Sequence, residues 1–262
     1  MALALAVAGI GFAAGALSGL LGIGGGILAA PLLLYVPPAL GLPALSMHSV
    51  SGLTITQALV AGVVGALSHV RRGTVDRGLA SAMAPAIFLA ALAGAGFSRY
   101  VSHEALLAVF GSLVVAAVAL LFRPVPLPAE PEAGGTAFSR PGAVAIASSV
   151  GFLGGLAGQG GSFLLVPAMT GLLGVPLRVA MGSNLVIVSA SSVAGFLGKA
   201  LTGQVPFGLA LVLVAGVVPG ARVGSRWHHR TPTRVLRWVL GLVLVGACAR
   251  IAWDLFGPGP GG

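Results

Sequence analysis

The residues of this sequence that could bind a ligand are neutral hydrogen-bond donors set within apolar segments. They are the amide side chains of Gln57, Gln159 and Asn184 and the hydroxyl side chains of Ser18, Thr54, Ser162 and Ser183. Burying an amide without a partner is costly, so we expect Gln57 and Asn184 to face a polar cavity. A single Ser or Thr in an apolar helix more often bonds its own backbone, which is a structural role. Neutral donors suit a hydrated anion that must bind and also leave.

The ionisable residues favour neither a metal site nor an enzyme. All five acidic residues fall in loops or at the ends of apolar segments: Asp76, Glu104, Glu130, Glu132 and Asp254. No carboxylate or second histidine stands at metal-ligand spacing from His48, so we expect no metal and no cofactor. His48 remains a candidate proton or anion partner. We predict no catalysis, and the lack of a mid-membrane carboxylate argues against a proton-coupled cation carrier.

Two glycine clusters interrupt the apolar segments. The first contains Gly22, Gly24, Gly25 and Gly26, and the second contains Gly158, Gly160 and Gly161. Such clusters discourage helix and expose backbone amides, which attract an anion at the start of the next helix. Open backbone at membrane depth is tolerated only where it is buried in protein or lines a cavity. We therefore predict that the two clusters face each other near mid-depth and cradle an anion, whereas glycines spaced by four serve helix packing.

The two clusters belong to an internal duplication. The stretch 15–31 returns at 151–167, 136 positions later, with several of its glycines and the closing proline (Pro31 and Pro167) at equivalent places. Further along, the two halves continue to match at an offset of 130, as at Gly52 and Gly182. The change of offset falls in a loop, where it costs little.

Composition makes the chain an integral membrane protein, because only 7% of its 262 residues are charged and 57% are hydrophobic, against about 25% charged in a soluble domain. We predict an all-α polytopic fold, built as an inverted repeat of two five-element halves with glycine-broken or re-entrant helices. The expected elements cover about 3–21, 27–36 (stopped by Pro37-Pro38), 45–70, 78–98, 105–122, 142–157, 163–173, 179–201, 207–226 and 235–256. The expected organisation is a first transmembrane repeat over 1–123, a Pro-rich cytoplasmic linker over 124–140, a second, inverted repeat over 141–256 and a disordered tail over 257–262.

The distribution of basic residues predicts how the chain lies in the membrane. Five elements per half would turn the second half upside down, and the loops then divide the cations unequally. One side receives Arg71, Arg72, Arg77, Arg123, Arg140, Arg178, Arg222, Arg226, Arg230, Arg234 and Arg237, and the other receives Arg99, Lys199 and Arg250. The positive-inside rule places the first side in the cytoplasm, with both termini outside a cell inner membrane, and it explains the net charge of +9 without nucleic acid. Lys199 could draw anions near the outer end of its span, or simply extend its ammonium to the interface.

Four motifs resemble the TauE/SafE sulfite exporter family. They are SGLLGIGGG over 18–26 with Pro31, GLAGQGG over 155–161 with Pro167, HVRRGTVD over 69–76 and GSNL over 182–185. The resemblance covers both halves and implies a transporter of sulfite, organosulfonates or related sulfur anions. The second cluster departs from the family's glycine run at Gln159 and Ser162, whose side chains can donate hydrogen bonds, so we expect selectivity to reside there.

The function expected from these observations is export of a small sulfur-containing anion by alternating access. An anion channel or a carrier of another ion on the same plan is the main alternative, followed by a membrane assembly subunit or an intramembrane enzyme. The expected partners are the small anionic substrate and the lipid bilayer, with a homo-oligomer left open.

Overall fold

The computed structural model describes residues 1–21, 26–71, 75–122 and 138–228, together with 245–246, 249–250 and 253. Several expectations fall on other residues: Gly22, Gly24 and Gly25 of the first glycine cluster, most of the linker, most of the tenth segment, and the tail. Every regular element in the described ranges is a helix. The all-α prediction is therefore confirmed for this part of the chain.

The described helices follow the order expected for two successive halves. The first half contains α1 (Ala2–Leu21), α2 (Gly26–Ala39), α3 (Met47–Arg71), α4 (Arg77–Phe97), the short 3₁₀ turn η1 (Ser98–Tyr100) and α5 (His103–Phe122). The second contains α6 (Arg140–Ala157), α7 (Ser162–Leu173), α8 (Leu177–Leu201) and α9 (Phe207–His228). Three described helices are long and apolar enough to cross a membrane, over Arg77–Tyr100, Val179–Leu201 and Phe207–Gly224, and four shorter described helices are also apolar.

Helix α2 corrects one expected boundary. We expected Pro37 and Pro38 to stop it, but the helix runs through both to Ala39. A proline fits helical φ, and its cost comes from the missing N–H and the ring's clash with the carbonyl four residues back. Here both prolines lie in the final turn, and the chain then turns off through Gly41 (φ 70°), where the Leu42 N–H donates to the carbonyl of Pro37 at 2.9 Å.

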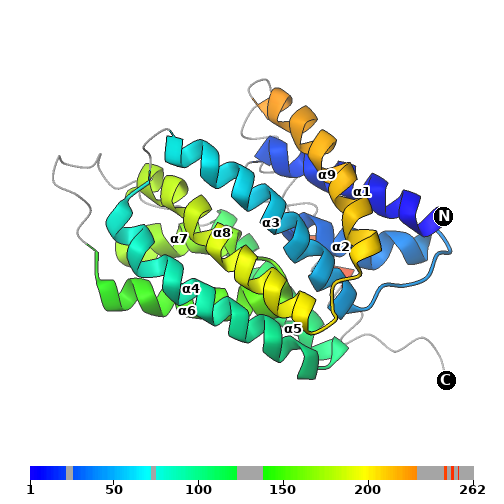
Figure 1. Ribbon diagram of the computed structural model, residues 1–262, viewed down its shortest axis with the longest axis horizontal. Helices are drawn as coiled ribbons and strands as arrows, with labels where there is room; N and C mark the ends of the chain where they lie inside the picture. Colours follow the sequence, from blue (N-terminus) through cyan, green and yellow to red (C-terminus); the bar gives the residue numbers. More distant parts are fainter. Residues whose placement is uncertain are drawn as a thin grey trace.

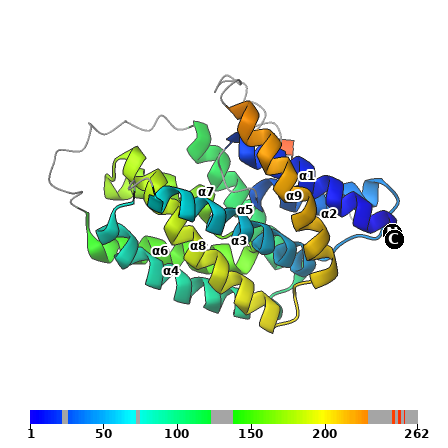
Figure 2. The same cartoon turned by 45° about the horizontal axis from the view of Figure 1, so that its top comes forward.

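Two helix pairs frame the molecule, with α3 and α8 between them. In both ribbon views α1 lies along α9 at one corner, and α4 lies along α6 on the opposite side (Figures 1 and 2). Glycine residues allow the two helices of each pair to pack closely against each other. A Cβ added at Gly15 would lie 2.5 Å from the Val217 carbonyl oxygen, and one at Gly151 would lie 2.7 Å from that of Ile87. These two contacts correspond to each other under the sequence offsets of 136 and 130, so the duplicated segments make equivalent contacts.

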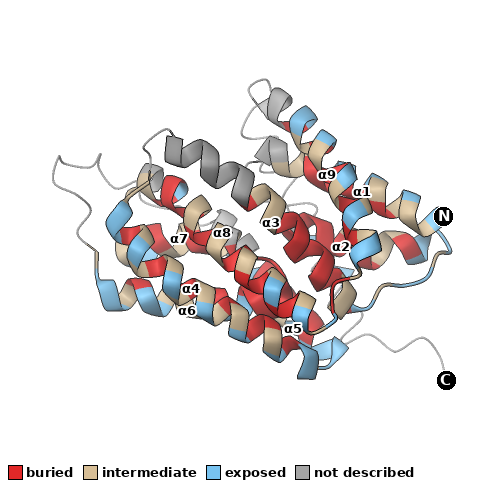
Figure 3. Ribbon diagram, viewed as in Figure 1, coloured by how far each residue is buried: buried red, intermediate tan, exposed pale blue. Residues whose placement is uncertain are grey.

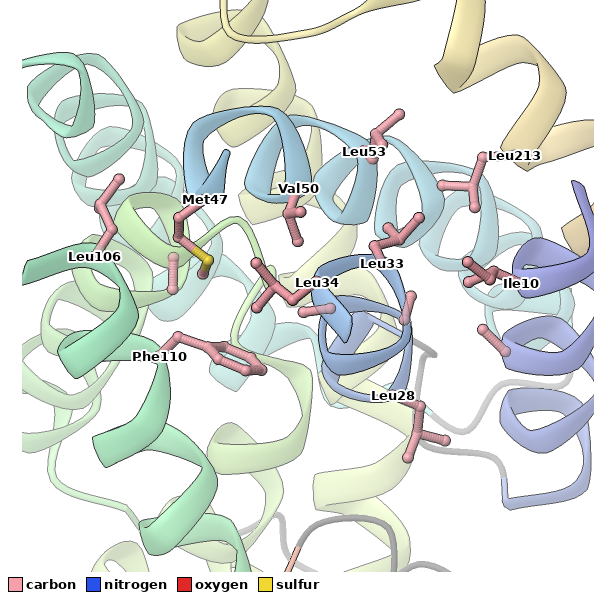
Figure 4. Packing of buried hydrophobic residues seen from close by; sticks show 14 of the residues in the cluster. Ile10, Leu28, Leu33, Leu34, Met47, Val50, Leu53, Leu106, Phe110 and Leu213 are labelled. Carbon is pink, nitrogen blue, oxygen red and sulfur yellow. The ribbon is translucent and has the colours of Figure 1, made fainter. Parts of the chain in front are cut away.

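The buried apolar residues form two clusters. The first surrounds α2, whose Leu28, Leu33 and Leu34 lie between Phe110 of α5 and Ile10 of α1 (Figure 4). The second joins α4, α6, α7 and α8 around residues such as Met83 and Leu165. The first half of α3 is buried in the middle of the molecule, and its polar side chains Ser51, Thr54, Thr56 and Gln57 are buried with it (Figure 3).

Candidate substrate-binding site

The break between α6 and α7 is a four-residue glycine loop, Gly158–Gly161. Helix α6 ends at Ala157, and its C-cap residue Gly158 (φ 75°) donates its N–H to the carbonyl of Gly154. Gly160 (φ 66°) and Gly161 (φ 76°) are also left-handed, a backbone conformation that side-chain-bearing residues rarely adopt. Gly161 is the N-cap of α7 and offers no side chain to cap it. The positive end of the α7 dipole therefore opens onto this loop.

Helix α3 holds the loop from one side. The Thr54 hydroxyl lies 2.8 Å from the Gly158 carbonyl oxygen and can donate to it, and the same hydroxyl lies 3.0 Å from the Val50 carbonyl. Gln57 follows Thr54 by one helical turn and so lies on the same face of α3. The Gln57 side chain is fully buried. Neither its oxygen nor its nitrogen has a hydrogen-bond partner within the described part of the chain.

Helix α8 also contacts the loop. A Cβ added at Gly160 would lie 2.8 Å from the Ser192 hydroxyl oxygen and 3.7 Å from Cγ1 of Val188. Asn184 precedes Val188 by four residues, so it lies on the same stripe of α8 as Ser192. The Asn184 Oδ1 and the hydroxyls of Ser191 and Ser192 are buried and unpartnered among the described residues.

The start of α2 closes the site. Gly26 is buried, and a Cβ added there would lie 3.1 Å from Oε1 of Gln159. The end of the first glycine cluster thus touches the second cluster. Gln159 is 1% exposed, and both polar atoms of its side chain lack a partner among the residues the structure describes.

The combined result is a group of five buried neutral polar side chains on α3, α8 and the glycine loop that both helices contact. We call it the polar cluster, and its members are Gln57, Gln159, Asn184, Ser191 and Ser192. Leaving a buried polar group unsatisfied costs about 1–3 kcal/mol, so native proteins rarely do so without a bound molecule or water to satisfy it. Amide and hydroxyl groups can donate to the oxygens of an anion. No group of three possible metal ligands occurs in the described ranges.

Thr54 contacts the glycine loop without belonging to this cluster, and three other predicted side chains are not members of it. His48 stands in the first turn of α3, with Nε2 3.1 Å from the Val101 carbonyl oxygen. The Ser183 hydroxyl accepts from the Asp76 N–H at 3.0 Å, which joins α8 to the start of α4. Ser18 is half-buried near the end of α1. The side chain of a fourth, Ser162, is not among those described, although the residue begins α7.

Ser191 and Ser192 were not among the predicted site residues, although they belong to the cluster. A signal for Ser192 was present in the sequence, because Asn184, Val188 and Ser192 repeat at intervals of four, which places them on one helix face. The sequence does not indicate which face of α8 meets the glycine loop. That depends on the partner helices.

Comparison with known proteins identifies the family. Residues 7–251 match the family described as sulfite exporter TauE/SafE. The chain is 26% identical over 252 residues to "Probable membrane transporter protein YunE" of Bacillus subtilis, covering 90% of this chain and 92% of that protein. It is 28% identical over 249 residues to a "Probable membrane transporter protein" of Xylella fastidiosa, covering 93% and 91%. It is also 26% identical over 237 residues to "Probable membrane transporter protein YfcA" of Escherichia coli K12, covering 89% and 84%. No solved structure matches the chain.

The match spans nearly the whole chain, includes both halves of the duplication and agrees with the apolar helices of the structure. This protein is therefore a membrane transporter that belongs to the TauE/SafE family.

Proposed function

We propose that this transporter exports a small sulfur-containing anion, such as sulfite or an organosulfonate, and that the polar cluster binds it. The observation that carries the proposal is a set of five buried neutral side chains, unpartnered among the described residues, on the Gly158–Gly161 loop and on the two helices that contact it, α3 and α8. A tetrahedral or pyramidal oxyanion presents several acceptor oxygens, and the amides and hydroxyls of the cluster supply donors for them. Neutral donors hold such an anion without trapping it.

The charged residues that the structure describes favour an anionic substrate over a cationic one. Asp76 and Glu104 are the only carboxylates in the described ranges, and neither belongs to the cluster. Asp76 caps the start of α4, where its Oδ1 accepts from the Leu79 N–H at 2.9 Å. Glu104 stands exposed in the first turn of α5. The helix dipole of α7 adds partial positive charge at the loop.

Alternating access would follow from an inverted repeat. Gly15 contacts Val217 in the same way as Gly151 contacts Ile87. This equivalence supports a pseudo-symmetry operation that exchanges the two halves of the chain. Under that exchange α3 and α8 change places, and both line the polar cluster. The site then lies between the halves, where rocking of one half against the other would open it to each side in turn.

The experiment has two steps. In the first, the purified protein is heated with sulfite, sulfate, thiosulfate, methanesulfonate and taurine, and a selective rise in Tm identifies the bound anion through linkage. In the second, flux of that anion is measured in liposomes for Ser192→Ala and for the control Ser112→Ala. Ser112 is exposed on α5, and its hydroxyl donates to the Val109 carbonyl at 2.7 Å. Removing this hydroxyl should therefore leave transport unchanged.

We expect Ser192→Ala to raise the concentration for half-maximal flux by about tenfold or more, because a hydrogen bond to a charged group contributes about 1.5–3 kcal/mol. Flux that never saturates would indicate a channel on the same plan. If no anion shifts Tm and none crosses the liposome membrane, the proposal is wrong.

A further inference from the structure

Lys199, the only lysine in the sequence, is buried in the last turn of α8. Its relative exposure is 0%, so the ammonium does not extend toward an interface. Of the two roles that the sequence left open for Lys199, extension of the ammonium to the interface is therefore excluded, and attraction of an anion remains. A long charged side chain near a helix end usually reaches for solvent, and one that does not needs a reason.

The ammonium is held by three oxygen atoms. Nζ lies 2.9 Å from the Ser98 hydroxyl, 3.2 Å from the Leu156 carbonyl and 3.2 Å from Oε1 of Gln204. An ammonium has three N–H donors, so every donor has an acceptor. This arrangement suits the charged form of the side chain.

All three acceptors are formally neutral, which leaves the positive charge without a counter-charge among the residues that the structure describes. Asp76 contacts Ser183 near the opposite end of α8, and Glu104 lies exposed at the start of α5. No ion pair joins either carboxylate to Lys199. Burying an unpaired charge is expensive, and an apolar or amide side chain could tie these helix ends together at lower cost. The charge itself therefore needs an explanation.

The position of Lys199 connects it to the glycine loop. Leu156 lies in the last turn of α6, two residues before Gly158, and its carbonyl is among those that a helix end leaves unsatisfied. Lys199 also continues the stripe of α8 that contains Val188 and Ser192. Between them on this stripe, a Cβ added at Gly195 would lie 4.0 Å from Cα of Gly155. Lys199 thus lies at the end of the same helix face that lines the polar cluster.

We propose that the Lys199 ammonium supplies the positive counter-charge for the anion bound in the polar cluster, and so selects anions over uncharged molecules of the same shape. The inference rests on the proposed function. In this role Lys199 does not touch the substrate. It acts across the end of α6 as an electrostatic positioning residue.

The test uses the fact that the chain has a single lysine. Labelling with ¹⁵N-lysine gives one Nζ signal in the NMR spectrum of the detergent-solubilised protein. Sulfite should move that signal in a saturable way, whereas uncharged dimethyl sulfone at the same concentration should not. An Nζ signal that stays fixed while sulfite saturates the protein, as judged by Tm, would overturn the inference.

A pair of variants tests the affinity. Lys199 lies seven residues beyond Ser192, which is about 10 Å along α8 at a rise of 1.5 Å per residue. Lys199→Met should therefore raise the sulfite Kd by about tenfold, the effect expected for unit charges at that separation and an effective dielectric constant of about 20. Arg99→Met removes the same charge from an exposed position and should leave Kd unchanged. A folded Lys199→Met protein with the wild-type Kd refutes the role. If Lys199→Met does not fold, the NMR titration of the wild type decides. If the wild-type protein binds no anion at all, the proposed function itself has failed.

Discussion

Replacing Gly160 with alanine should impair transport much more than it impairs folding. Gly160 has φ 66° and faces the polar cluster, where an added Cβ would lie 2.8 Å from the Ser192 hydroxyl oxygen. Gly174 at the end of α7 provides the matched control. It has φ 67°, but an added Cβ there meets nothing within 4 Å.

The two substitutions share one cost and differ in another. Each forces an alanine into the left-handed region, at about 1–2 kcal/mol. Only Gly160→Ala also pushes the Ser192 hydroxyl aside and fills space beside the cluster. Losing that hydroxyl's bond to an anion amounts to about 1.5–3 kcal/mol, or roughly ten- to a hundredfold in affinity.

The assay compares Tm and anion flux for both variants in the same liposome preparation. We expect similar falls in Tm, with flux near wild type for Gly174→Ala and a sulfite affinity ten- to a hundredfold weaker for Gly160→Ala. The reasoning is refuted if Gly160→Ala transports as well as Gly174→Ala at equal protein level. It is also refuted if both lose flux in proportion to their lost stability.

Two further predictions concern a buried amide of the polar cluster and the close packing of α1 against α9. Gln57→Leu should hold or raise Tm by removing two unpartnered buried polar atoms while it weakens anion binding; a fall in Tm together with unchanged flux would contradict this. Gly15→Ala should lower Tm, since its Cβ would lie 2.5 Å from the Val217 carbonyl oxygen, whereas Gly9→Ala on the same helix meets nothing within 4 Å and should be neutral or stabilising. Thermal denaturation of the two variants in one detergent compares them directly, and equal shifts would show that α1 and α9 do not pack as described.

Much of the fold could be predicted because its signals are local. Apolar length, glycine interruptions and the repeated stretch predicted the order of the described helices and placed their ends within about three residues. The main error was the end of α2, where Pro37 and Pro38 are accommodated in a final turn. The site was only partly predictable. Gln57 and Asn184 were chosen for the cost of burying an amide and Gln159 for its place in the second glycine cluster, and all three are buried in the structure.

The tertiary structure alone decided which polar residues gather together. Ser183 and Ser192 lie on the same helix and have the same chemistry, yet one bonds the Asp76 backbone and the other faces the glycine loop. Likewise, the sequence allowed Lys199 to reach the interface, and the structure buries it against Ser98, Leu156 and Gln204. The sequence by itself determined that the chain is an apolar, duplicated helical protein, because hydropathy and repetition are properties of the chain alone. The partners of each side chain depend on which helices pack against it, and those helices come from distant parts of the sequence.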